Sequence, residues 1–341
     1  MTSPAGVGFV GSGLDRPECV IATESGDLFV SHRTRGVARV APDGTVPVLS
    51  DPVSHQGVPL LPNGIALRRD GSFLVSNIAD PGGLFVLDAE GCRPFVTEMS
   101  GRPLPPINFV TLDEAGRVWF SVSSVLNPRH LAYRKDVRNG FVAVIEDGRP
   151  RIVVDGLHYT NEIRPDLEAG VLYVSETFGK HITRFPLSGD LEAGPREIAA
   201  TFPRGAFVDG FALDVDGGLV AACIVSNEIF HVHVDGSLHR LLGERDDTWF
   251  DEVEASLDAG TMGRRHFDQT PSGILCNVSS VAFRGEHLDE LVCGSLLGDR
   301  LVTLPAPAKG RVPVHWSWRA FDSLPRIETR SGPEGGGGRK F

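Results

Sequence analysis

The chain has 341 residues, a net charge of −11 and a pI near 5.5, which argues against a nucleic-acid partner because phosphate binding requires a basic face. Its apolar runs are far shorter than the roughly 20 residues needed to cross a bilayer, so we expect no membrane span and no membrane partner. Forty glycines and twenty-four prolines, with β-branched runs between them, indicate an all-β chain with many turns.

The first residues, MTSPAGVGFVGSG, contain no positive charge and no long apolar core. The sequence therefore shows no secretory signal, and we expect a cytoplasmic protein. The stretch Gly6–Gly11 matches the dinucleotide pattern GxGxxG, but Asp15-Arg16-Pro17 follows where a helix should run, so the context excludes that site. We expect this stretch to be a strand that pairs with the C-terminal part of the chain and closes the fold.

From residue 18 onward one unit recurs six times: an Asn, Asp or Glu opens a short apolar run, and a turn glycine follows eight or nine residues later. The opening residues, called openers below, are Glu18, Asn63, Asn108, Asn161, Asp209 and Asn277. A strand-like stretch follows each glycine, in order LFVSH, FLVSN, VWFSV, VLYVS, LVAAC and LVCGS. The openers are 45, 45, 53, 48 and 68 residues apart, the period of a β-propeller blade. The sequence predicts one six-bladed β-propeller domain over residues 1–330 and a disordered glycine-rich tail over 331–341.

Residues at one equivalent position of every blade meet around the central channel, so the six openers should face one another at one mouth. All six side chains offer oxygen, which suits a hard cation such as Ca²⁺ better than a softer metal. Without a cation, the two buried carboxylates would repel, and one would have to hold a proton. For a single Asn, a local turn contact is the better explanation, but six openers in register favour a metal-binding channel.

The segments LPNGIALRRDG, TNEIRPDLEAGVLYVSET and VDGFALDVDGGLVAAC resemble the senescence marker protein/gluconolactonase/luciferin-regenerating enzyme family over nearly the whole chain. That family forms six-bladed propellers with a divalent cation in the channel. The resemblance implies metal ligands at Glu18, Asn161 and Asp209, with Asn108 completing the shell or contacting the substrate. It places Asn63 and Asn277 farther out, where they reach the ion through water or not at all. Ca²⁺ is the expected ion, with Zn²⁺, Mn²⁺ and Mg²⁺ as alternatives.

The expected activity is that of a metal-dependent hydrolase, a lactonase or esterase, acting on a small cyclic or activated ester. The ion would polarise the carbonyl oxygen, and Asp209 would activate water or attack directly. Asn108 and His158 are the other catalytic candidates, the latter because it lies three positions before Asn161. No binding site for an organic cofactor is expected, and the sequence makes no prediction of oligomeric state.

Two features leave other functions open. Sugar-lactonase members carry an Arg two residues before the third opener, where this chain has Pro106. The stretches AYRKDVRNGFV, DGLHYTNEI and SETFGKHITRFPLSGDL resemble strictosidine synthase-like propellers, so condensation, isomerisation or a lyase reaction is an alternative. A binding propeller with a structural ion is the other, because a fold does not by itself define a function.

Two insertions interrupt the blade period. The first, Ser123–Asn139, is basic, and we expect it to form a lid over the channel mouth that suits an anionic or strongly polar substrate. Its polar and charged residues include Arg129, His130, Tyr133, Arg134, Lys135 and Arg138. The second, Arg245–Ser272, has apolar residues at helical spacing and predicts a helix packed on the propeller rim. These apolar residues are Trp249, Phe250, Val253 and Leu257.

The five cysteines show no metal-binding spacing, and their odd number suits reduced thiols in a cytoplasm. Cys19 and Cys276 adjoin openers, which makes a catalytic thiol one interpretation. Packing as small strand residues is the favoured interpretation, because a free cysteine usually behaves as a hydrophobic side chain.

Overall fold

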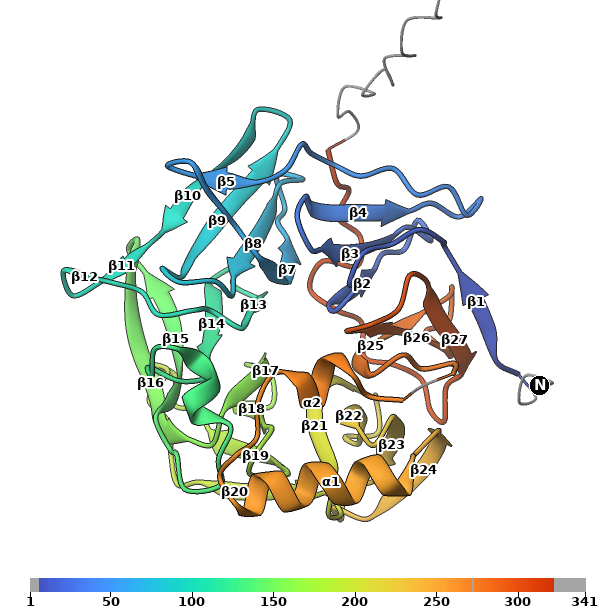
Figure 1. The fold of residues 1–341 in the computed structure, drawn as a ribbon. Helices are drawn as coiled ribbons and strands as arrows, with labels where there is room; N and C mark the ends of the chain where they lie inside the picture. The colour runs from blue at the N-terminus through green and yellow to red at the C-terminus, as the bar shows by residue number, and fades with distance from the viewer. Residues whose placement is uncertain (1–5, 272, 322–341) are drawn as a thin grey trace, which may run out of the picture.

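The computed structural model of the chain describes residues 6–271 and 273–321. Its strands form six antiparallel sheets in a ring around a central channel (Figure 1), which confirms the six-bladed β-propeller. The inner strands are β2 (Val20–Ala22), β7 (Pro62–Leu67), β13 (Phe109–Leu112), β17 (Thr160–Asp166), β21 (Ala206–Leu213) and β25 (Val278–Arg284). The predicted disordered tail over 331–341 lies outside the described residues.

The remaining strands extend each blade outward from its inner strand, and two short hairpins lie between blades. In blades 1 to 3 the outer strands are β3 (Leu28–His32), β4 (Gly36–Val40), β8 (Phe73–Asn77), β9 (Gly83–Asp88), β10 (Gly91–Val96), β14 (Val118–Val122), β15 (Gly140–Glu146) and β16 (Arg149–Leu157). In blades 4 to 6 they are β18 (Val171–Glu176), β19 (His181–Pro186), β20 (Glu197–Thr201), β22 (Leu219–Val225), β23 (Glu228–Val232), β24 (Leu238–Gly243), β26 (Glu290–Ser295) and β27 (Leu301–Pro305). The hairpins are β5 (Ser54–His55) with β6 (Val58–Pro59), and β11 (Glu98–Met99) with β12 (Arg102–Pro103).

The ring is closed by the N-terminal segment. Strand β1 (Gly8–Val10) pairs antiparallel with β27, with Gly8 opposite Thr303 and Val10 opposite Leu301. This pairing confirms the strand expected from the GVGFVG stretch. It covers the outer edge of the last blade and joins the two ends of the chain, so the ring does not depend on packing alone.

The six turn glycines explain the regular spacing of the openers. Their φ values run from +63° at Gly170 to +87° at Gly71, a left-handed conformation that glycine adopts without a steric penalty. Each glycine reverses the chain from an inner strand into the next strand of the same blade. These next strands, β3, β8, β14, β18, β22 and β26, contain the six stretches predicted from the sequence.

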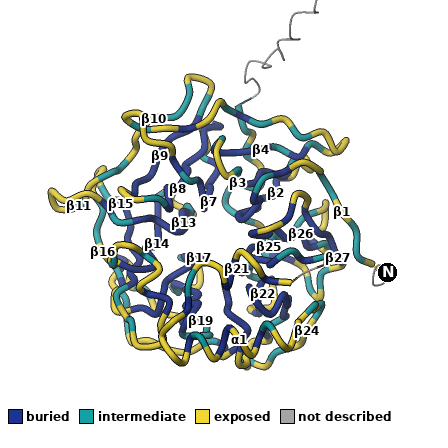
Figure 2. The backbone as a smooth tube through the Cα atoms, in the orientation of Figure 1, coloured by how far each residue is buried: buried dark blue, intermediate teal, exposed yellow. Residues whose placement is uncertain are grey.

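Apolar side chains fill the spaces between adjacent blades. Phe29 of blade 1 lies against Phe73 of blade 2, with ring centroids 5.0 Å apart, and Trp119 of blade 3 is fully buried. Burying one such side chain contributes about 1.5–3 kcal/mol, and every blade both gives and receives these contacts. Figure 2 shows the buried backbone concentrated in the inner strands and the exposed backbone in the outer loops.

Both insertions lie on the face of the propeller where the inner strands begin. Strand β14 reaches this face at Val122, and the first insertion, which contains a single helical turn, η1 (Arg129–Ala132), leads from there into β15. The second insertion contains α1 (Asp247–Asp258) and α2 (Arg265–Asp268) (Figure 1). We call residues 123–139 and 245–271 the cap. The last residue of the second insertion, Ser272, lies outside the described part of the chain.

The helix predicted in the second insertion is confirmed. The side chain of Asp246 accepts a hydrogen bond from the Trp249 N–H at 2.8 Å and caps the first turn of α1. Phe250, Val253 and Leu257 are buried under the helix, whereas Trp249 is only partly buried. The two halves of the cap share one apolar cluster. In it Tyr133 packs against Tyr159, Phe178 and Phe267 with ring centroids 5.2–5.4 Å apart.

A C-terminal strap, residues 309–321, crosses the opposite face. Its backbone hydrogen-bonds to four blades, through Gly310 N to Leu288 O (2.8 Å), Arg311 N to Leu213 O (3.0 Å), Glu24 N to Trp316 O (2.8 Å) and Phe321 N to Gly71 O (3.1 Å). The strap therefore covers the end of the channel away from the cap. Over the described range, the helices are all too short or too polar to traverse a bilayer.

Candidate functional site

Local irregularities in the inner strands set the direction in which the opener side chains point. The antiparallel register shifts between Pro62 and Ile65, between Thr160 and Ile163, and between Val208 and Phe211. These bulges contain Asn63, Asn161 and Asp209, and a β-bulge redirects a side chain from the regular alternation. All six openers are buried, with exposures from 0% for Asn277 to 8% for Glu18.

Serine side chains fix the backbone of four openers to a neighbouring blade. Four Ser Oγ atoms donate to opener carbonyl oxygens: Ser76 to Asn108 (3.0 Å), Ser121 to Asn161 (2.6 Å), Ser175 to Asp209 (2.6 Å) and Ser279 to Glu18 (3.1 Å). The first three stand in the repeated stretches FLVSN, VWFSV and VLYVS. The sequence reasoning passed over this repeated serine, which holds the openers in register around the ring.

The two carboxylate openers act on each other electrostatically. Burial raises the pKa of Asp209 well above its usual range, and the negative charges of Glu18 and Glu162 raise it further. Burial also raises the pKa of Glu162, although its ion pair with Arg164 (2.5 Å) opposes that shift. The expected repulsion between buried carboxylates is therefore present at the mouth, where it contributes to the raised pKa of Asp209.

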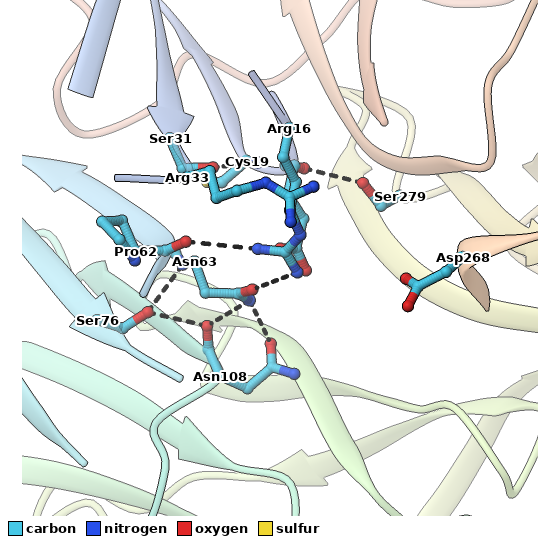
Figure 3. A network of polar contacts seen from close by, with 12 residues as sticks. Arg16, Cys19, Ser31, Arg33, Pro62, Asn63, Ser76, Asn108, Asp268 and Ser279 are labelled. Atoms are coloured by element: carbon cyan, nitrogen blue, oxygen red, sulfur yellow. Dashed lines mark hydrogen bonds and ion pairs between the residues drawn. The ribbon is translucent and has the colours of Figure 1, made fainter. Parts of the chain in front are cut away.

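An arginine that the sequence reasoning missed stands among the openers. Arg16 Nη2 lies 2.5 Å from Glu18 Oε2 and donates to Asn63 Oδ1 at 3.1 Å, while Arg16 Nη1 contacts Pro62 O at 3.5 Å (Figure 3). Arg16 is only 5% exposed and has a positive φ of 55°. Glu18 thus already has one cationic partner supplied by the chain itself.

Hydrogen bonds hold the amide groups of the openers in place. Asn108 Nδ2 donates to Ser123 Oγ at 3.0 Å, Asn108 Oδ1 accepts from Asn63 Nδ2 at 3.4 Å, and Asn161 Nδ2 donates to Thr177 Oγ1 at 3.2 Å. Asn277 uses both ends of its amide for contacts outside the ring of openers. Its Oδ1 accepts from Val225 N at 2.7 Å and its Nδ2 donates to Phe267 O at 2.8 Å, so it joins blade 5 to the cap.

Asn63 also makes contacts inside the ring. Its Nδ2 donates to the Asn108 carbonyl oxygen at 2.9 Å, and its Oδ1 is the acceptor for Arg16. Asn63 therefore contacts Asn108 directly and is linked to Glu18 through Arg16, and Asp209 is linked to Glu18 through charge. Asn161 occupies the equivalent bulge in blade 4, but its contacts with the other ligand candidates remain a prediction.

His158 makes its contacts within blade 4. Its backbone N–H donates to Glu176 Oε2 at 2.7 Å, and its Nδ1 lies 3.5 Å from the same oxygen. His181 Nε2 lies 3.2 Å from Glu176 Oε1. Burial would raise the pKa of Glu176, but hydrogen bonds from His158, His181 and Thr183 outweigh burial and hold that pKa well below its usual range.

The ligand atoms of His158, Glu176 and His181 lie within 4.8 Å of one another, close enough to share a metal ion. However, Arg196 Nη2 lies 2.6 Å from Glu176 Oε1 and 2.8 Å from His181 Nε2. A guanidinium already supplies the positive charge there. We therefore interpret this cluster as a neutralised ion-pair network beside the mouth.

The thiols next to the openers suit packing better than catalysis. Cys19 is buried, its Sγ lies 3.9 Å from Ile65 O, and burial raises the pKa of the thiol. Cys276 is partly exposed and lies 4.0 Å from Gly273 O through its Sγ. Cys19, Cys92, Cys223 and Cys293 are free thiols.

The other end of the channel has a different lining. A cavity of about 150 Å³ lies between the later parts of the inner strands and the C-terminal strap, and most of its wall is apolar. Its lining includes Ile65, Phe109, Arg164, Leu213, Val314 and His315. The guanidinium of Arg164 lies 4.8 Å from the Phe109 ring centroid and 5.4 Å from that of Phe211, next to its ion pair with Glu162.

A comparison with models of protein families identifies the family of this chain. Residues 15–242 match the family model described as the SMP-30/Gluconolactonase/LRE-like region, which covers more than half of the sequence. The chain therefore belongs to this family, as its motifs suggested. A comparison with curated protein sequences gives no match.

Solved structures support the same architecture. A gluconolactonase from Xanthomonas campestris is 21% identical, with a TM-score of 0.61 over 87% of this chain and 88% of that chain. A luciferin-regenerating enzyme is 15% identical, with a TM-score of 0.65 over 93% and 100%. The calcium-binding protein regucalcin from Agrobacterium tumefaciens is 15% identical, with a TM-score of 0.59 over 93% and 98%. At these identities, the likeness establishes the fold.

Proposed function

We propose that the protein is a metal-dependent hydrolase that acts on a lactone or another activated ester of a small molecule. The observation that carries this proposal is the buried carboxylate pair of Glu18 and Asp209 at the capped mouth, with amide openers around it. Membership of the SMP-30/Gluconolactonase/LRE-like family supports a lactonase-type reaction, and the gluconolactonase among its structural neighbours agrees with it.

The residues at the mouth fit a divalent cation. Glu18, Asn108, Asn161 and Asp209 offer only oxygen, the donor set that Ca²⁺ prefers. The raised pKa of Asp209 shows that the positive charge of nearby arginines does not compensate its burial. Because Arg16 pairs with Glu18, an ion bound by Glu18 would compete with this guanidinium. When bound, the ion would act as a Lewis acid toward a carbonyl oxygen.

The chain's own residues supply the remaining chemistry. Asp209 is the candidate base, because a carboxylate held beside a divalent ion stays ionised near neutrality and can accept a proton from water. Asn108, fixed by Ser123 and the Ser76 hydrogen bond to its carbonyl, would orient the ester. The cap would limit the access of water to this mouth.

Metal analysis of the purified protein, followed by a panel of lactones with and without chelator, tests the proposal. We expect about one divalent ion per chain and hydrolysis that chelator abolishes and Ca²⁺ restores. A protein that holds no divalent ion and hydrolyses none of the lactones would contradict the proposal. That outcome would favour the non-hydrolytic or binding alternatives.

A further inference from the structure

Three arginines from separate parts of the chain surround the channel mouth. Arg16 precedes β2, Arg129 belongs to the first half of the cap, and Arg264 belongs to the second half. All three act electrostatically on Glu18, and Arg16 is acted on in turn by the other two. Folding therefore gathers a positive cluster above the carboxylates of a chain whose net charge is −11.

Two of these arginines have a carboxylate partner, whereas Arg129 has no carboxylate in direct contact among the described residues and interacts with the Tyr133 phenol. Arg16 pairs with Glu18 at 2.5 Å and Arg264 Nε donates to Asp268 at 2.9 Å. Arg129 Nη1 is shielded from solvent and has no hydrogen-bond partner in the described part of the chain. Its guanidinium lies 5.6 Å from the ring centroid of Tyr159. A shielded donor without a partner costs about 1–3 kcal/mol, so this atom is positioned to donate a hydrogen bond to an external acceptor.

Two arginines of the cap act on the phenol of Tyr133. Burial would raise the pKa of the Tyr133 phenol, but the positive charges of Arg129 and Arg264 outweigh burial and hold that pKa below its usual value. Tyr133 is only 3% exposed and lies against Tyr159, with ring centroids 5.4 Å apart. The positive charges of Arg129 and Arg264 would act in the same way on another oxyanion placed beside them.

We propose that Arg129 and Arg264 form an anion subsite in the cap that binds a carboxylate or phosphate group of the substrate above Glu18 and Asp209. The Arg264 side chain is 42% exposed and marks the solvent side of the subsite, while the shielded Nη1 of Arg129 marks its inner side. A guanidinium presents paired N–H donors that match a carboxylate or phosphate. This assignment rests on the proposed function. Together, the two proposals predict that the substrates are lactones or esters that carry an ionised group.

Calorimetric titration in the presence of chelator tests the subsite without turnover and without metal. Inorganic phosphate and glutarate are titrated separately into the wild-type protein and the Arg129→Gln and Arg138→Gln variants. Arg138 is the matched control, because it is an exposed arginine of the same insertion. We expect saturable binding of at least one anion to the wild type, about tenfold weaker binding to Arg129→Gln, and unchanged binding to Arg138→Gln. No binding to the wild type, or equal losses in both variants, would overturn the proposal.

Melting curves of the unliganded variants show whether Arg129→Gln folds. If it does not, the exposed Arg264→Gln variant takes its place, with at least threefold weaker binding expected and unchanged binding overturning the subsite. A pair of lactones that differ only in a carboxylate then separates the two proposals. Hydrolysis without preference for the charged lactone, together with no anion binding, would contradict the proposed subsite and support the proposed hydrolase. Arginine-dependent anion binding without hydrolysis would support the proposed subsite and contradict the proposed hydrolase.

Discussion

The two ends of the channel are built from the same six strands but differ in chemistry. At the capped mouth, Glu18 and Asp209 are buried close to each other, and the pKa of Asp209 is raised. At the opposite end, the cavity is mostly apolar, and the buried carboxylate of Asp166 has Arg311 of the strap as its partner. The mouth thus contains an unfavourable arrangement of charges, and the opposite end of the channel does not. This difference is expected when a functional site is less stable than it could be.

The Asp209→Asn substitution tests the mouth and has the largest expected effect. We expect turnover to fall by about a thousandfold, because an amide cannot accept the proton that a base removes. Stability in chelator should rise by about 1 kcal/mol at neutral pH, a size common when a functional site is relieved. Hydrolysis assays and urea unfolding of both proteins measure the two effects. The exposed Asp51→Asn variant is the control and should change neither.

The pH dependence of this stabilisation has a defined sign. Because the folded-state pKa of Asp209 is raised, the folded protein holds this proton more strongly than the unfolded chain. Protonation of Asp209 therefore stabilises the folded protein at low pH. This stabilisation is lost as pH rises from the ordinary aspartate pKa of about 4 through the raised pKa of the folded protein. The stability gain of Asp209→Asn should grow as pH rises through this window. A gain that shrinks with rising pH would show that Asp209 is not a destabilised carboxylate.

At the other end, Arg311→Met should affect stability and leave activity unchanged. The substitution removes the partner of Asp166, whose side chain is 5% exposed, and should cost about 2 kcal/mol. Because Arg311 itself is 40% exposed, we expect less than the full cost of breaking a buried pair. The double variant with Asp166→Asn should recover part of the loss. A change in turnover greater than about twofold, with folding intact, would mean that the two ends are coupled.

Metal affinity separates the roles of two neighbouring arginines. Arg16→Gln should bind Ca²⁺ about tenfold more tightly, close to 1.4 kcal/mol, because Glu18 no longer has a competing guanidinium. Arg33→Gln is the matched control, since Arg33 lies near Arg16 but pairs with Asp15 at 3.0 Å (Figure 3). Calorimetric titration with Ca²⁺ compares the two variants. Equal gains in both would indicate a general charge effect and not release of Glu18.

The repeats made most of the fold predictable. Glycines with positive φ and strands at a constant offset are local features, so they appear in the sequence at a fixed period. The positions of Arg16, Arg129 and Arg264 are different, because they depend on a left-handed residue and on two insertions packing together. The serine contacts lie between these cases. The serine repeats visibly, but its acceptor is in the next blade, which only the closed ring brings near.

His158 illustrates why closeness in sequence to Asn161 did not predict where its side chain points. It lies three positions before Asn161, yet the intervening Tyr159 has a positive φ of 55°, which redirects the chain as it enters β17. The described contacts of the His158 ring are with Glu176 and His181 in the outer part of blade 4. A catalytic role for His158 therefore stays a prediction that its contacts do not favour.

The His158→Gln substitution has the smallest expected effect and decides this point. We expect turnover to stay within about threefold of wild type, because the backbone N–H bond to Glu176 is retained and the ring is not needed at the mouth. Stability should fall by about 1 kcal/mol through loss of one partner of Glu176. His181→Gln, the other histidine on this carboxylate, is the matched control and should behave alike. If His158→Gln alone reduces turnover a hundredfold at unchanged stability, then blade 4 contributes directly to the chemistry, and the boundary of the active site extends beyond the ring of openers.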